Sequence, residues 1–243
     1  MQRYFDYHYA GTPFELFGPG HLAALGILAA IIIFLFASKH DLGEAARQRA
    51  RRSLIAAFLF VEVAYLVWLV TSDAWNFREH LPLHLCSFSI WGSVYVLVTR
   101  SYRAYEIVFF LGIVGASQAI LTPSAGQYGL PHFRAFQTLS SHSLVVIAMV
   151  YMTAIEGFRP TWRSVWKAML AINLLALLVT GMNLLLGSNY MYTLHKPATA
   201  SLFDHMGPWP WYLVYTEFLA LALFSLLYLP FMLTRSRRPS PAE

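Results

Sequence analysis

Cysteine and charged residues are both scarce in this chain of 243 residues. The single cysteine, Cys86, excludes an intramolecular disulfide framework and a zinc site built from several thiolates. Charged residues make up 12% of the chain, against the roughly 25% that is typical of soluble domains. Together with 58% hydrophobic residues and a mean hydropathy of +0.52, this composition predicts an integral membrane protein with a single domain over residues 1–243.

Several motifs are also absent, and each absence removes a class of function. The chain has no glycine-rich phosphate loop and no HExxH sequence, so neither of those sites is predicted. The last apolar run contains no lysine, which excludes a retinal Schiff base there. His80 and His84 are four residues apart and can face one another as metal ligands, but no second pair accompanies them. We therefore predict no metal and no cofactor.

Seven apolar runs are each near the roughly 20 residues that a helix needs to cross a bilayer. They lie at about His21–Ser38, Leu54–Thr71, Leu81–Thr99, Ile107–Leu121, Phe136–Ile155, Val165–Leu186 and Trp211–Leu233. Because only helices and closed barrels satisfy the backbone in lipid, and the runs show no alternation of period two, helices are favoured. The predicted fold is an all-α bundle of seven transmembrane helices.

The basic residues divide very unequally between the two sides of this bundle. Of the 17 Lys and Arg residues, 13 fall in loops 39–53, 100–106 and 156–164, the start of the sixth helix and the tail. The other 4 are Arg3, Arg78, Arg134 and Lys196. Since cytoplasmic loops are the basic ones, the N-terminus is expected outside and the C-terminus in the cytoplasm, in the cell membrane. Basic residues spread over short loops do not predict a nucleic acid partner.

Polar residues within the predicted helices concentrate in the outer half of the bilayer. At about 1.5 Å per residue, Cys86 and His142 lie at nearly the same depth on the third and fifth helices. The other polar residues of the helices are His21, Glu62, His84, Gln118, Asn183 and Glu217. Intramembrane ionisable groups usually face the bundle interior and mark a functional site. The pattern predicts a polar pocket that opens toward the outer leaflet.

Two predicted outer loops add polar and aromatic residues near this pocket. Segment 73–80 reads DAWNFREH, and segment 189–212 is long and aromatic. Trp209, Trp211 and Tyr212 are typical of an interfacial aromatic anchor. The alternative is that the long segment forms a lid over the pocket, which His195, Lys196 and Asp204 would help to line. Both interpretations stay open at this stage.

The depth shared by Cys86 and His142 suggests nucleophilic chemistry. A histidine within hydrogen-bond reach can remove the thiol proton and produce the reactive thiolate, and Glu217, Asn183 or Gln118 could orient that histidine. A thiolate at the level of lipid ester carbonyls favours acyl transfer or ester hydrolysis. The simpler interpretations are that Cys86 is a small buried hydrophobe and that His142 bonds helices together.

Three segments of the chain resemble a known family: LPLHLCSFSIW, SSHSLV and NYMYTLHKP followed by SLFDHMGPWPWY. They are similar to the YwaF-like bacterial integral membrane proteins over about Phe17 to Phe231, most specifically in GPWPWY. That family looks similar to a eukaryotic transmembrane acyltransferase that remodels ether phospholipids through a cysteine. It more distantly resembles the androgen-induced membrane hydrolases, which use a threonine and a histidine. The resemblance implies that Cys86 is the nucleophile, in place of threonine, and that His142 is the histidine.

Two functions of different classes follow from these observations. The first is a lipid acyltransferase or esterase that uses Cys86 and His142, with membrane lipids as its partners. The second is a non-enzymatic carrier or sensor that binds a lipid or small molecule in the same pocket. No inverted repeat or pair of broken helices indicates transport.

Overall fold

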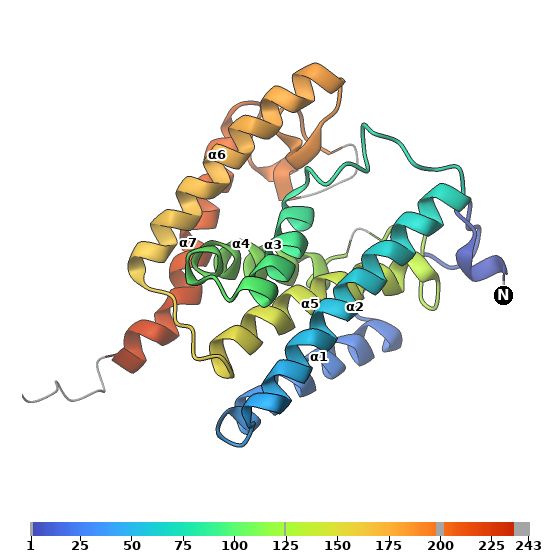
Figure 1. Ribbon diagram of the computed structural model, residues 1–243. Helices are drawn as coiled ribbons and strands as arrows, with labels where there is room; N and C mark the ends of the chain where they lie inside the picture. The colour runs from blue at the N-terminus through green and yellow to red at the C-terminus, as the bar shows by residue number, and fades with distance from the viewer. Residues whose placement is uncertain (1, 124, 198–201, 236–243) are drawn as a thin grey trace, which may run out of the picture.

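The computed structural model describes residues 2–123, 125–197 and 202–235. These residues form seven α-helices and four short 3-10 helices, and the all-α prediction is confirmed for them (Figure 1). The α-helices are α1 (Pro19–Ala37), α2 (Glu44–Thr71), α3 (Leu85–Thr99), α4 (Tyr102–Leu121), α5 (Phe133–Ala154), α6 (Trp162–Leu186) and α7 (Trp211–Arg235). The 3-10 helices are η1 (Gln2–Phe5), η2 (Ser38–His40), η3 (Tyr190–Tyr192) and η4 (Leu202–His205). Arg237 and Arg238, which entered the topology count, lie outside the described residues.

Six α-helices in the described ranges are long and apolar enough to cross a membrane, as expected of a multi-pass membrane protein. The exception is α3, whose 15 residues rise only about 22 Å, less than the ~30 Å of a hydrocarbon core. The predicted start of this run at Leu81 is four residues too early. Pro82 disfavours a helical conformation at the residue before it, and His84 becomes the N-cap with φ −75° and ψ 150°. The structure therefore supports six spans and one short apolar helix.

In contrast to α3, several helices begin before the predicted spans. α2 starts at Glu44 rather than at Leu54, and α4 starts at Tyr102 rather than at Ile107. A cap contributes to the extension of α4, because it satisfies a backbone N–H group that has no partner within the helix, whereas no side chain caps α2. The Ser101 hydroxyl accepts the Ala104 N–H at the start of α4. Apolar residues thus mark the membrane-embedded part of each helix rather than its end.

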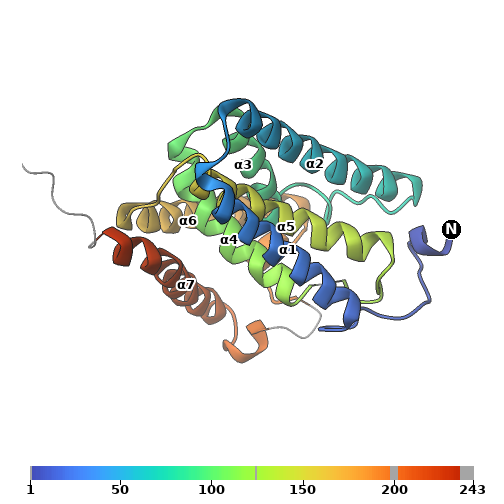
Figure 2. The same cartoon turned by 90° about the horizontal axis from the view of Figure 1, so that it is seen from below.

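Helices α4 and α5 form the centre of the bundle. The views in Figures 1 and 2 place α1 and α2 against α5, and α6 and α7 on the other side, against α4. Glycines allow the central helices to approach closely. A Cβ atom at Gly92 of α3 would lie 2.8 Å from Val108, and one at Gly112 of α4 would lie 2.9 Å from Val145. This packing brings helices from both sides around one central pair.

Ion pairs between buried carboxylates and more exposed basic residues lie at one end of the bundle, called the basic end here. The Glu156 side chain is 2% exposed and pairs with Arg51 at 3.1 Å and with Arg100 at 2.6 Å. Glu106 pairs with Lys167 nearby. These are the three ion pairs of residues 2–123, 125–197 and 202–235. Both buried carboxylates at the basic end, Glu106 and Glu156, are therefore paired within the protein.

The loop after α6 is held by a fully buried asparagine. α6 ends at Leu186 and is capped by Gly187, whose φ of 63° is the left-handed conformation that closes many helices. The Asn183 Nδ2 donates to the Tyr190 carbonyl at 2.9 Å and to Thr193 Oγ1 at 3.0 Å. Its Oδ1 accepts from Ser188 Oγ at 2.9 Å and from the Tyr190 N–H at 2.8 Å. One side chain thus fixes the fold of residues 188–193.

Replacing Asn183 by leucine is expected to destabilise the protein and to loosen this loop. Four buried partners would lose their hydrogen bonds, at a cost of about 3 kcal/mol in the free energy of unfolding. Denaturant unfolding of the purified protein in detergent measures the loss, and proteolysis within residues 188–197 reports the loop. Asn173→Leu is the matched control, because Asn173 is exposed and its change should cost less than about 1 kcal/mol. Equal losses in the two variants would contradict the assignment.

Candidate functional site

A large cavity of about 2130 Å³ opens at the end of the bundle opposite the basic end. It exceeds the roughly 300–1,000 Å³ of ordinary ligand pockets. Helices α2 to α7 and both predicted outer loops contribute to its wall. Seven of the eight residues predicted for the site line it: Cys86, His142, His84, Gln118, Glu217, His195 and Asp204. Asn183 is the exception, because its amide is fully buried beneath the loop that it holds.

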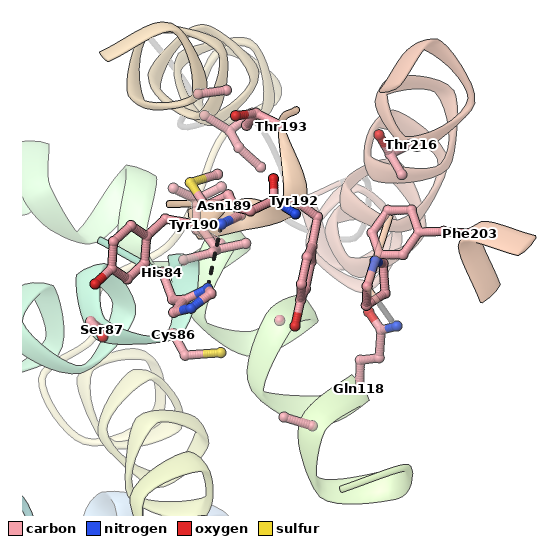
Figure 3. A pocket seen from close by; sticks show the side chains of 18 of the residues that line it. His84, Cys86, Ser87, Gln118, Asn189, Tyr190, Tyr192, Thr193, Phe203 and Thr216 are labelled. Carbon is pink, nitrogen blue, oxygen red and sulfur yellow. Dashed lines mark hydrogen bonds between the residues drawn. The ribbon is translucent and has the colours of Figure 1, made fainter. Parts of the chain in front are cut away.

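Cys86 lies in the first turn of α3 and is half-buried. Figure 3 shows its sulfur pointing into the space bounded by Gln118 of α4 and Tyr192 of η3. The first backbone N–H groups of a helix have no partner within it, and no side chain caps the start of α3. The thiol is therefore accompanied by free N–H donors and by the positive end of the helix dipole. This position differs from the predicted one, several residues below the start of a helix.

His142 presents one ring nitrogen as a free proton acceptor. Its Nδ1 is 2.7 Å from the Thr138 carbonyl oxygen, which can only accept, so the proton of the neutral imidazole lies on Nδ1. Nε2 then carries the lone pair, and it is buried without a hydrogen-bond partner. Cys86 and His142 line the same cavity, but no hydrogen bond joins the sulfur to Nε2. The geometry brings an acid and a base into one cavity without direct contact.

His84 connects the start of α3 to the loop that borders the cavity. The Met191 N–H points at His84 Nδ1 over 3.4 Å (Figure 3). The imidazole also packs against Tyr190 and Tyr192, with ring centroids 5.0 and 6.0 Å away. Met191 and Tyr192 both have a φ of 55°, an uncommon conformation for residues other than glycine. Neighbouring contacts therefore hold this part of the wall in a strained shape.

The described part of segment 189–212 contributes to the cavity wall, while Trp209 and Trp211 are exposed and their predicted role as an anchor stays open. Tyr192, Thr193, His195 and Phe203 all line the cavity. The Tyr212 hydroxyl donates to the Tyr192 carbonyl at 2.5 Å, so an aromatic residue predicted as an anchor instead fixes the wall. Residues 198–201 of the segment lie outside the described residues.

The remaining predicted residues are distributed around the wall. Glu217 of α7 accepts a hydrogen bond from Asn173 of α6 at 2.8 Å. His195 is held by Asn189, whose Nδ2 is 2.9 Å from His195 Nδ1. Gln118 and Asp204 are exposed within the cavity. Glu217, His195 and Gln118 form no hydrogen bond with His142 in the described residues, and the Thr138 carbonyl orients its imidazole instead.

A cluster of polar residues around Arg134 also lines the cavity and was not predicted from the sequence. Arg134 was counted as an outer-loop charge, but it is the second residue of α5 and lines the cavity. Its Nη1 donates to Gln137 and to Thr138 Oγ1, three and four residues further along the helix. Tyr65 and Glu62 of α2 lie on the same side of the cavity, with the Arg134 guanidinium 4.7 Å from the Tyr65 ring centroid. The i, i+3 and i+4 spacing of polar residues after Arg134 was the available signal.

His80 and His84, the possible metal-ligand pair, both direct Nδ1 at a backbone N–H group. His80 Nδ1 accepts the Asn76 N–H at 3.0 Å, and His84 Nδ1 faces Met191. Burial lowers the pKa of His80, while the Glu79 carboxylate opposes that effect. Within the described ranges, no group of three or more His, Cys, Asp or Glu side chains is arranged to hold a metal ion.

Comparison with known proteins assigns the chain to one family. Neither the curated proteins nor the solved structures contain a match. Residues 16–228 match the TMEM164 family, a family of transmembrane proteins, and this range includes α1 to α6, most of α7 and the whole cavity wall. The chain with this cavity therefore belongs to the TMEM164 family.

Proposed function

We propose that the protein is a membrane-embedded lipid acyltransferase or ester hydrolase in which Cys86 is the nucleophile and His142 the general base. The observation that carries the proposal is the state of His142: Nδ1 is committed to Thr138, and Nε2 is buried, unpartnered and in the cavity that holds the only thiol. A buried acceptor without a partner costs free energy, so its retention points to a use in chemistry.

In the first half of the reaction, His142 Nε2 takes the proton from Cys86, and the thiolate attacks the carbonyl carbon of a lipid ester. The free N–H groups at the start of α3 are suited to stabilise the oxyanion of the tetrahedral intermediate. The carbon–oxygen bond of the ester then breaks, and the leaving alkoxide takes the proton from His142. The products are a thioester on Cys86 and a lipid with a free hydroxyl group.

In the second half, a lipid hydroxyl or a water molecule gives its proton to His142 Nε2 and attacks the thioester carbonyl. The carbon–sulfur bond breaks, and the leaving thiolate of Cys86 recovers the proton. A lipid hydroxyl as attacker gives acyl transfer, and water gives hydrolysis. Substrate must close the gap between sulfur and imidazole, which agrees with the way catalytic hydrogen bonds tighten in enzyme–substrate complexes.

The relationship to other families belongs to the same proposal. The resemblance of LPLHLC and SSHSLV to the YwaF-like proteins, and through them to a cysteine-dependent ether-phospholipid acyltransferase, supports an acyl-transfer role for Cys86. The expected substrates are membrane lipids, and the expected location is the cell membrane.

The absence of a sulfur–imidazole bond favours one alternative, a non-enzymatic lipid carrier or sensor that uses the same cavity. A volume of about 2130 Å³ accommodates a lipid in either function. In the carrier, Cys86 would be a small cavity-wall residue, and filling the cavity by Ala176→Phe would abolish function, whereas Cys86→Ser would preserve it.

The enzymatic proposal predicts how an acyl-fluorophosphonate or chloroacetamide probe labels the protein. Wild-type protein should be labelled at Cys86, and Cys86→Ala should not be labelled. His142→Gln should slow labelling by about 100-fold or more, because general-base assistance is lost. Ser87→Ala is the matched control, since Ser87 is the next residue of α3, lines the same cavity and should leave the rate unchanged. The readout is in-gel fluorescence with peptide mapping.

A second measurement follows the acyl group itself. Incubation with a fluorescent phospholipid should produce an acyl adduct on Cys86 that hydroxylamine removes, as thioesters require. Equal labelling of wild type and Cys86→Ala, or full lipid turnover by Cys86→Ala, would reject the enzymatic proposal.

We also propose seven spans with the N-terminus outside, in which the extended residues 81–84 and α3 together complete the third crossing. Cysteine labelling in intact cells tests this in the Cys86→Ala background. A membrane-impermeant maleimide should label Trp75→Cys in intact cells, and should label Glu44→Cys only after permeabilisation; both positions are exposed. Labelling of both positions on the same side would reject the arrangement.

A further inference from the structure

Two ionisable side chains of opposite sign, Glu62 and Arg134, line the polar cavity and take part in no ion pair of the described residues. Glu62 of α2 forms no hydrogen bond with the described residues, and its Oε1 atom is fully buried. Arg134 of α5 takes part in none of the three ion pairs of the described ranges, which all lie at the basic end. Unpaired charges within a membrane protein are costly, and they usually mark a functional site. Neither residue has a role in the acyl-transfer steps.

Side-chain contacts hold the arginine apart from the glutamate. Arg134 Nη1 donates to Gln137 and, at 2.5 Å, to Thr138 Oγ1, and the guanidinium stacks 4.7 Å from the Tyr65 ring centroid. Arg134 and Glu62 line the same cavity, but the two groups are not within ion-pair distance. The hydrogen bonds of the guanidinium within the described residues use only Nη1, which leaves Nε and Nη2 available, and a planar fork of this kind binds phosphate oxygens in pairs.

The arrangement suits a ligand that carries both signs of charge. An anion alone would satisfy Arg134 but would be repelled by Glu62, and a cation alone would have the reverse problem. A zwitterionic lipid headgroup brings a phosphate and an ammonium a few bonds apart. The aromatic face of Tyr65 is occupied by Arg134, and Glu62, three residues before Tyr65 on α2, is the carboxylate beside this guanidinium that can receive the ammonium.

We propose that Arg134 and Glu62 form the headgroup subsite of the cavity, in which Arg134 binds the phosphate and Glu62 the ammonium of a zwitterionic glycerophospholipid. This inference rests on the proposed function in one respect: it makes the bound lipid the substrate of Cys86. Glu62, Arg134, Cys86 and His142 all line the same cavity, so the subsite and the thiol belong to one site. Headgroup capture would then place the ester region of the lipid at the start of α3.

Binding is measured on the purified full-length protein in the Cys86→Ala background, so that turnover does not enter the result. The probes are the short-chain lipids dihexanoyl-phosphatidylethanolamine, which is zwitterionic, and dihexanoyl-phosphatidylglycerol, which has the phosphate but no amine. Arg134→Gln should weaken binding of both lipids by about tenfold or more, because each loses a charge-assisted pair of hydrogen bonds. Arg134→Lys should give a smaller loss, since it keeps the charge without the fork.

Glu62→Gln is the decisive variant, because it is isosteric and removes no protein hydrogen bond. It should weaken phosphatidylethanolamine by about tenfold and leave phosphatidylglycerol unchanged or bound more tightly. The matched controls are Arg78→Gln and Glu79→Gln, which remove exposed charges of the same signs from the cavity wall and should change affinity by less than about twofold.

Each outcome decides the headgroup proposal separately from the enzymatic one. An equal effect of Glu62→Gln on both lipids, or no effect of Arg134→Gln, overturns the subsite. Effects of Arg78→Gln and Glu79→Gln as large as those of the cavity pair would show a general surface potential and would also overturn it. Selective loss of phosphatidylethanolamine binding supports the subsite even if Cys86→Ala proves to have full activity, a result that would reject only the acyl-transfer role.

Discussion

In hydrocarbon, a polar group without a partner costs several kcal/mol, and the two ends of this bundle meet that constraint in opposite ways. At the basic end, Glu156 and Glu106 are each paired with cations and hydroxyl groups of neighbouring helices. At the cavity end, the Oε1 atom of Glu62 and the Nε2 atom of His142 are buried without a hydrogen-bond partner in the described residues. The paired end holds the helices together, and the unpaired end requires partners that the protein does not supply. On our proposal those partners are the headgroup and the reacting groups of a lipid.

The apolar runs and the shared cavity were accessible from the sequence because both depend on simple geometry. Run length fixes how many helices can cross a membrane, and a rise of about 1.5 Å per residue fixes which side chains share a level. Cys86 and His142 line one cavity for this reason, although α3 begins four residues later than expected and α5 three residues earlier. Helix ends were less predictable, since caps such as Ser101 and the turn at Pro82 lie outside the apolar pattern.

The roles of individual polar side chains could not be predicted from depth alone. Asn183 lies at a suitable level, but a fold-back of residues 188–193 surrounds its amide and uses all of its hydrogen-bonding capacity within the loop. Arg134 showed the reverse error. It precedes the predicted span and resembled a loop charge, whereas the bonds to Gln137 and Thr138 turn it along α5 into the cavity. Which way a polar side chain turns depends on its neighbours three and four residues away, and no depth scale includes those contacts.

On our proposal, the separation between the Cys86 thiol and the His142 imidazole prevents reaction before a substrate binds. A thiolate formed permanently in this membrane-facing site would react with oxidants and with any accessible ester. Nδ1 of His142 is fixed by Thr138 and Nε2 has no hydrogen-bond partner in the described residues, so on our proposal the base is ready and no contact yet draws the proton from the thiol. A lipid whose headgroup is held between α2 and α5 would bring its ester to the start of α3 and exclude water from the gap. On the proposed mechanism, proton transfer then takes place only when a substrate occupies the cavity, and the empty site remains unreactive.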